Sequence, residues 1–140
     1  MILVAVALCL ILLAIALLHV AWGLGLPWPA ADETQRVATV IGLRGQTRMP
    51  GLLPCLAVAG ALGAVVAMIG WNTLTASPLT RAGLLAAAAV FLARGVAPWL
   101  LVWRRLTPQQ PFARLDRLVY GPLCLLLGVG LVFIVLVTPS

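Results

Sequence analysis

Four apolar runs divide this chain, at roughly 2–22, 50–71, 81–103 and 118–137. An α-helix rises about 1.5 Å per residue, so a run of about 20 residues crosses the roughly 30 Å hydrocarbon core of a bilayer. The chain is 64% hydrophobic and 9% charged, whereas soluble domains carry about 25% charged residues. The sequence therefore predicts an all-α integral membrane protein, one transmembrane domain over 1–140, with four helices in an up-down bundle.

The basic residues predict how the chain is oriented in the membrane. All nine are arginines, and seven of them lie in the loops 29–49 and 104–117, which share one side, against Arg81 alone on the other side. Because positively charged loops stay in the cytoplasm, we expect these two loops to be cytoplasmic and both termini to lie on the outer side. At the membrane surface these arginines would meet anionic lipid headgroups, and nucleic acid is not expected as a partner.

The first run and the first loop each leave a question about secondary structure. The run 2–22 is longer than the apolar part of a signal peptide, and no positive residue precedes it, so we expect a retained span. In the loop, Val37, Val40 and Ile41 recur at helical spacing after Asp32, a residue type that caps helices. A short helix lying on the membrane and a plain solvated loop both fit this pattern.

Arg94 is the one charged residue well inside an apolar run. A charge at the centre of a bilayer costs about 2.5–3.5 kcal/mol on insertion scales, so partners must hold it or a function must use it. Pro98 leaves the carbonyl of Arg94 free as an acceptor, and Asp116 is the nearest candidate counter-ion. Arg94 has either a purely structural role, reaching the headgroups along its own stem, or also contacts an anionic or polar ligand.

His19 lies at the same predicted depth as Arg94. Taking Trp28 and Trp103 as markers of the interface, both residues lie nine positions inside it, roughly 13–14 Å along a continuous helix. His19 and Arg94 would therefore occupy one level of the inner leaflet.

The fourth run adds polar residues from the opposite direction. Asp116, Tyr120 and Cys124 are spaced four apart, which places them on one face of a regular helix. We therefore predict an inner-leaflet pocket centred on the buried arginine, with these ligand-binding residues: Arg94, His19, Trp22, Asp116 and Tyr120.

No reaction or metal motif accompanies these residues. The three cysteines form no C-x-x-C pair, and the positions of His19, Cys55 and Cys124 do not follow the spacing of metal ligands. We therefore predict no catalytic residue, no cofactor and no metal.

Three functions remain open. The first is binding or transport of an anionic or polar small molecule or lipid headgroup in the predicted pocket. The second is an accessory subunit, in a homo-oligomer or a larger membrane complex, docked through the small residues of the second span. An enzyme is the weakest of the three, because acid–base chemistry would rest on His19, Asp116 and Tyr120 without a recognisable motif.

The two halves of the chain share a short pattern. Ala21-Trp22-Gly23 precedes Pro27-Trp28 near the end of the first run, and Ala93-Arg94-Gly95 precedes Pro98-Trp99 in the third. An arginine-bearing loop and a run that begins with proline and cysteine follow each pattern. Two repeated helical hairpins would place these features around a pseudo-two-fold axis along the membrane normal.

Several motifs together resemble a bacterial family. They are His19-x-x-Trp22, Arg94-Gly95-x-x-Pro98, and the stretch from Pro111-Phe112 through Asp116 and Tyr120 to Pro122-Leu123-Cys124. The chain resembles the four-span proteins catalogued as domain of unknown function 3995 along nearly its whole length. The resemblance implies an integral protein of the bacterial cytoplasmic membrane and implies no activity.

Overall fold

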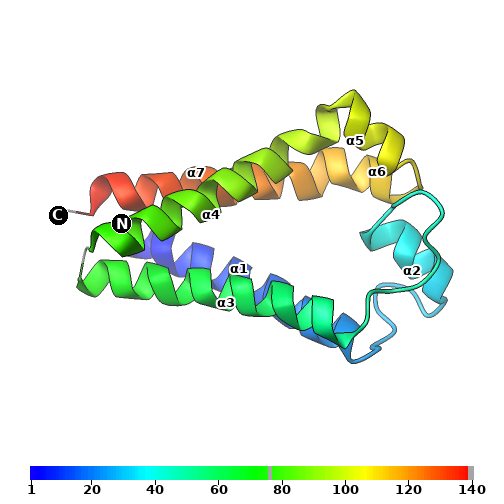
Figure 1. Cartoon of the computed structure of the whole chain (residues 1–140), viewed down its shortest axis with the longest axis horizontal. Helices are drawn as coiled ribbons and strands as arrows, with labels where there is room; N and C mark the ends of the chain where they lie inside the picture. Colours follow the sequence, from blue (N-terminus) through cyan, green and yellow to red (C-terminus); the bar gives the residue numbers. More distant parts are fainter. Residues whose placement is uncertain (76, 139–140) are drawn as a thin grey trace.

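Four long helices dominate the computed structural model, which describes residues 1–75 and 77–138. They are α1 (Ile2–Gly23), α3 (Leu52–Leu74), α4 (Pro78–Val96) and α7 (Gly121–Val137), and they run alternately up and down (Figure 1). Each is long and apolar enough, alone or with its flanking turns, to cross a membrane, and the described residues form no strand. The predicted all-α, four-span membrane protein is confirmed.

Short helices gather at the end of the bundle away from the two termini (Figure 1). They are α2 (Glu33–Val40), the 3₁₀ turn η1 (Ala97–Trp99), α5 (Leu101–Leu106), α6 (Phe112–Leu115) and the π-helical turn η2 (Asp116–Tyr120). The arginines of the two long loops lie in and around these elements, so we call this the arginine-rich end.

Helix starts follow the local sequence. The Ser77 hydroxyl accepts a hydrogen bond from the Thr80 amide (3.1 Å), and Pro78 takes the first helical position of α4, as the sequence predicts. A carboxylate oxygen of Asp32 accepts from the Gln35 amide (2.8 Å) and caps α2. The first loop therefore contains a helix and is not a plain solvated loop.

The four long helices pack as two hairpins. α1 contacts mainly α3, and α4 contacts mainly α7, with smaller contacts from α3 to α4 and from α1 to α7 (Figure 1). Close approach occurs at corresponding places: a Cβ on Gly23 would meet Cys55 at 3.0 Å, and a Cβ on Gly95 would meet the Leu125 amide at 2.9 Å. This arrangement is what two repeated hairpins would form, and the duplication itself stays a prediction.

The hydrophobic core fills only the half of the bundle near the termini. It consists of buried side chains from all four long helices: Ala5, Leu8, Leu12, Ala16, Leu62, Val65, Ile69, Leu84, Ala88, Leu127, Leu131, Ile134 and Val135. None of these comes from the parts of the helices nearest the arginine-rich end, such as 17–23 of α1 or 89–96 of α4. The two hairpins are therefore joined firmly at one end and diverge toward the other.

The sequence predicted one continuous helix as far as Trp103, but the third run is broken before it reaches that residue. The α-helix ends at Val96, a 3₁₀ turn follows, and Leu100 is extended (φ −78°, ψ 135°) before α5 begins. Pro98 explains the break, because its ring carries no N–H and clashes with the carbonyl four residues back. The chain changes direction here, so the depth of Arg94 cannot be counted along a helix from Trp103.

The fourth run begins earlier than predicted and contains a π turn. Helical structure starts at Phe112, and the Gly121 amide donates to the Asp116 carbonyl five residues back. Pro122 cannot donate to Leu118, and a local π turn accommodates that missing bond. The segment from Asp116 to Tyr120 is therefore not a regular α-helix, and the shared face predicted for Asp116, Tyr120 and Cys124 stays a prediction.

The glycines of the second span do not mediate close packing within the chain. A Cβ on Gly60 or Gly63 would meet no atom within 4 Å, whereas a Cβ on Gly128 would press on Leu92 at 2.7 Å. Glycines at close approach to another helix lie elsewhere, as Gly23 does against Cys55 and Gly128 against Leu92.

Candidate functional site

Arg94 and Asp116 form an ion pair across the α4/α7 hairpin. Nη2 of Arg94 donates to a carboxylate oxygen of Asp116 at 2.6 Å, and Asp116 is only 2% exposed. Arginine and carboxylate hold each other in a region where either charge alone would be costly. The counter-ion predicted from the sequence is thus in contact with Arg94.

Trp103 completes this group. Its indole N–H donates to the second carboxylate oxygen of Asp116 (2.8 Å), and its ring lies 5.0 Å from the guanidinium carbon of Arg94. A cation over an indole face is attracted to the ring, so Trp103 stabilises both members of the pair. Trp103 was predicted from the sequence only as a marker of the membrane interface, and its contacts with the ion pair were missed. The sequence signal that could have indicated them is Pro98, because the helix break there changes the direction of the chain before α5.

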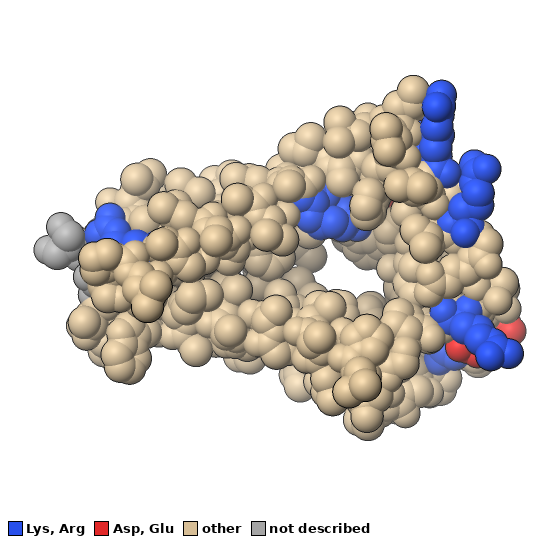
Figure 2. Space-filling view, in the orientation of Figure 1, with Lys and Arg blue, Asp and Glu red and all other residues tan. Residues whose placement is uncertain are grey.

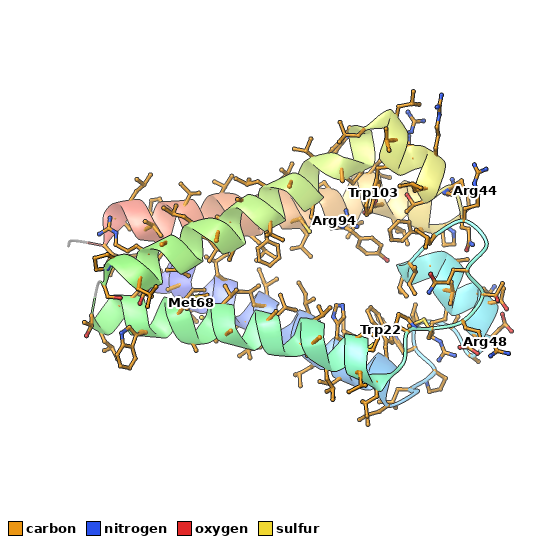
Figure 3. The ribbon with its side chains drawn as sticks, in the orientation of Figure 1. Trp22, Arg44, Arg48, Met68, Arg94 and Trp103 are labelled. Carbon is orange, nitrogen blue, oxygen red and sulfur yellow. The ribbon has the colours of Figure 1, made fainter. Side chains whose placement is uncertain are left out.

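The diverging hairpins enclose an opening, which we call the inter-hairpin hollow. Figure 2 shows that it passes between the α1/α3 and α4/α7 hairpins, across the direction of the helices. Arg94 lies at the α4/α7 side and Trp22 at the α1 side (Figure 3). The Arg94 side chain is 30% exposed, and among the described residues its one hydrogen bond is the one from Nη2. Nη1 is buried and has no hydrogen-bond partner, and Nε makes no hydrogen bond in the described part of the chain.

The arginine-rich end of the hollow is closed by α2 and the first loop. The Tyr120 hydroxyl donates to the Thr39 carbonyl (3.2 Å), and the Arg44 amide donates to the Leu106 carbonyl (2.8 Å). Gly42, at φ +66°, packs on the Phe112 ring, where a Cβ would lie 2.2 Å from a ring carbon. The hollow is therefore bounded at both ends of the bundle and is open sideways.

His19 and Trp22 form a separate group on α1. Their rings pack edge to face with centroids 5.3 Å apart, and His19 Nδ1 bonds to the Ile15 carbonyl (2.9 Å). The Trp22 indole donates to the Trp28 carbonyl (2.7 Å). The five residues predicted for the pocket thus fall into three groups around the hollow: Arg94 with Asp116, His19 with Trp22, and Tyr120 at the end wall.

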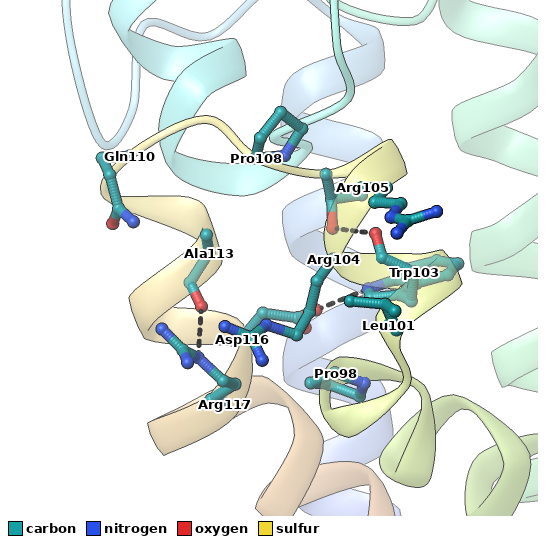
Figure 4. A pocket seen from close by; sticks show the side chains of 11 residues that line it. Pro98, Leu101, Trp103, Arg104, Arg105, Pro108, Gln110, Ala113, Asp116 and Arg117 are labelled. Atoms are coloured by element: carbon teal, nitrogen blue, oxygen red, sulfur yellow. Dashed lines mark hydrogen bonds between the residues drawn. The ribbon is translucent and has the colours of Figure 1, made fainter.

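A second concavity of about 310 Å³ opens at the arginine-rich end of the α4/α7 hairpin (Figure 4). Arg104, Arg105 and Arg117 line it, and Asp116 lies in its wall. Nε of Arg117 donates to the Ala113 carbonyl (3.1 Å), which leaves the two Nη groups free. Asp116 therefore borders this cationic pocket, while its partner Arg94 borders the hollow.

Cys9 and Cys55 pack against neighbouring side chains of the bundle. Cys55 is buried against Gly23 and donates weakly to the Pro50 carbonyl (3.7 Å), and all three cysteines are free thiols. No three His, Cys, Asp or Glu side chains gather at metal-binding distance within 1–75 and 77–138.

Fold and site together define a small polytopic helical membrane protein with a polar group inside the bundle. The model of the family described as "Protein of unknown function (DUF3995)" matches residues 12–131, so the chain belongs to that family. No curated protein and no solved structure matches the chain.

Proposed function

We propose that this protein binds an amphiphilic molecule of the membrane in the inter-hairpin hollow, with Arg94 donating to its anionic or polar head. The observation that carries the proposal is an arginine with unused donors beside a hollow that the core does not fill. An unfilled polar space inside a bundle is unfavourable unless water or a ligand occupies it. A ligand with a hydrogen-bond acceptor satisfies Arg94, and an apolar tail fits the lateral opening.

The depth of the hollow supports a lipid-like ligand. Residues 89–96 of α4 extend about 12 Å, close to the roughly 15 Å hydrocarbon thickness of one leaflet. The seven arginines of the two long loops support an orientation in which this leaflet is the cytoplasmic one of a bacterial inner membrane and both termini lie outside. A small polar solute from the cytoplasm would have to pass α2, whereas a lipid reaches the hollow from the side.

The orientation can be tested with reporter fusions. Alkaline phosphatase fused after Ser140 should be active, because this enzyme folds only outside the cytoplasm, and the same fusion in the 104–117 loop should be inactive. A reversed pattern of activities would contradict the orientation.

The ligand test removes the charge of Arg94 without leaving Asp116 unpaired. Lipids retained by the purified protein, from vesicles of phosphatidylglycerol and phosphatidylethanolamine, would be measured by native mass spectrometry. We expect the double variant Arg94→Leu/Asp116→Asn to retain about tenfold less of one lipid than the wild type, the loss expected for a charge-assisted hydrogen bond. The control Asp116→Asn keeps Arg94 and should keep the lipid. Equal retention by the double variant and the wild type would refute the role of Arg94.

The pocket lined by Arg104, Arg105 and Arg117 supports an additional contact with anionic headgroups. Basic pockets between membrane helices on the cytoplasmic side suit phosphate groups. These arginines lie at the end of the bundle where headgroups of the same leaflet would be, so they would raise the local concentration of anionic lipid near the hollow.

A second candidate function is that of an accessory subunit. The open glycines of α3, Gly60 and Gly63, leave a small-residue face on which a second copy or a larger membrane complex could pack closely. A stable partner that co-purifies in mild detergent would favour it, and a single monodisperse species would count against it.

An enzyme has the least support. The side-chain hydrogen bonds of the three residues go to different groups: that of His19 to the Ile15 carbonyl, those of Asp116 to Arg94 and Trp103, and that of Tyr120 to the Thr39 carbonyl. None of these bonds links two of the three residues, so no acid–base pair is formed.

A further inference from the structure

Arg36 lies buried without a counter-ion at the end of α1. It is 8% exposed, and its Nη1 donates to the Leu26 carbonyl (2.9 Å). Nε has no hydrogen-bond partner, and within 1–75 and 77–138 no carboxylate oxygen lies within 4.0 Å of the guanidinium. A charge taken out of water costs several kcal/mol unless an opposite charge compensates it, so this arrangement calls for an anion.

Arg36 and Glu33 line the same small pocket without pairing. The pocket, about 190 Å³, is lined by Trp22, Gly25, Leu26, Glu33, Arg36 and Met49. Glu33 lies one turn before Arg36 on α2, a spacing at which opposite charges usually attract. Instead, one oxygen of Glu33 accepts from the Met49 amide (2.9 Å). A cation and an anion thus border one cavity, each with capacity to bind a further group.

We propose that this pocket binds a zwitterionic phosphate ester with a nearby ammonium group, the chemistry of the phosphoethanolamine headgroup. The phosphate would accept from Arg36, because a guanidinium matches phosphate oxygens with paired donors. The ammonium would donate to the free oxygen of Glu33. An anion without a cationic group would be repelled by the Glu33 carboxylate in the same pocket. A cation without an anionic group would leave the charge of Arg36 uncompensated.

The walls of the pocket fit a headgroup that is attached to a lipid. Trp22, Leu26 and Met49 contribute apolar surface beside the two charges. Tryptophan is favoured at the headgroup level, which places this pocket at the boundary between water and hydrocarbon. The free headgroup compound has the same charges, so the source must be distinguished by experiment.

This site stands apart from the one proposed around Arg94. The two share only the region of Trp22, and within the described residues Arg36 and Glu33 make no hydrogen bond to Arg94, Asp116 or Trp103. Failure of either proposal therefore leaves the other in place, provided that each is tested with its own variants.

The test compares wild type with Arg36→Gln, Glu33→Gln and the control Arg44→Gln, which changes an exposed arginine of the same loop. Each protein would be incubated with vesicles of equal phosphatidylethanolamine and phosphatidylglycerol, and retained lipid would be measured by native mass spectrometry. We expect the wild type and the control to prefer phosphatidylethanolamine about tenfold, the amount expected for one charged hydrogen bond.

The two variants separate the roles of the two charges. Arg36→Gln should lose retention of both lipids at this site, and Glu33→Gln should retain lipid but lose the preference. Glu33→Gln keeps the test decisive even if Arg36→Gln fails to fold. No preference in the wild type, or an unchanged preference in Glu33→Gln, would overturn the proposal.

A second measurement identifies the source of the headgroup. Millimolar phosphoethanolamine, added to the delipidated protein, should raise the melting temperature of the wild type and not of Arg36→Gln if the free compound binds. Retention of the lipid without this shift would assign the site to the lipid. Absence of both effects would refute the pocket as a phosphoethanolamine site.

Discussion

Replacing Arg94 with leucine should lower the free energy of unfolding by about 3–5 kcal/mol, the loss typical when one member of a buried ion pair is removed. The reason is Asp116, which is 2% exposed and would lose its cationic partner, so that the Trp103 indole remains as its side-chain hydrogen-bond donor. The measurement is unfolding of the purified protein in detergent, followed by circular dichroism.

A double variant gives this prediction a sharper form. Arg94→Leu/Asp116→Asn should be more stable than Arg94→Leu alone, although it carries one more substitution. The neutral amide of asparagine no longer needs a counter-ion and can still accept from Trp103. The exposed Arg44→Leu serves as the control and should change stability by less than about 0.5 kcal/mol. A double variant less stable than Arg94→Leu would contradict the ion pair as the source of the effect.

Gly95→Ala should destabilise the α4/α7 hairpin by about 1–3 kcal/mol, the cost of overpacking a tight contact. An added Cβ would lie 2.9 Å from the Leu125 amide nitrogen and 2.7 Å from its side chain. Backbone atoms cannot move aside as a flexible side chain does, so the helices would have to separate. Because Arg94 precedes Gly95, we expect the Arg94–Asp116 distance to increase as well.

Gly60→Ala is the matched control for this prediction. It makes the same chemical change in another membrane helix, at a position where no atom lies within 4 Å of the added Cβ. Alanine favours a helix by about 1 kcal/mol over glycine, so this variant should be equally stable or slightly more stable. Equal melting temperatures for the two variants would contradict the close packing of α4 on α7.

Many features of the site could be predicted from local sequence. Asp116 was the nearest acidic residue to Arg94 once the spans were assigned, and burial of one charge in an apolar helix demands the other. Pro98 predicted that the carbonyl of Arg94 would lose its helical partner. These inferences needed only the length of each run and the chemistry of single residues.

Arg36 shows what local sequence could not predict. As one of the seven arginines in the two long loops, it carries no signal that separates it from Arg44 or Arg48. It is buried only because α2 packs at the end of α1, where Leu26 accepts from it. Such burial depends on contacts between elements that lie apart in the sequence.

The sequence by itself determined the four membrane spans, because a bilayer requires about 20 apolar residues for each crossing whatever the neighbouring helices are. Only the tertiary structure decided which half of the bundle contains the packed hydrophobic core. The core joins the hairpins near the termini, and α2 bridges them at the arginine-rich end, which leaves the hollow beside Arg94. His19, Arg94 and Tyr120 all lie in the open half of the bundle, but the presence of polar residues does not by itself tell whether the helices around them pack together or diverge. The difference arises from glycine contacts, the break at Pro98 and the π turn at Asp116–Tyr120, whose effects depend on the partner helix.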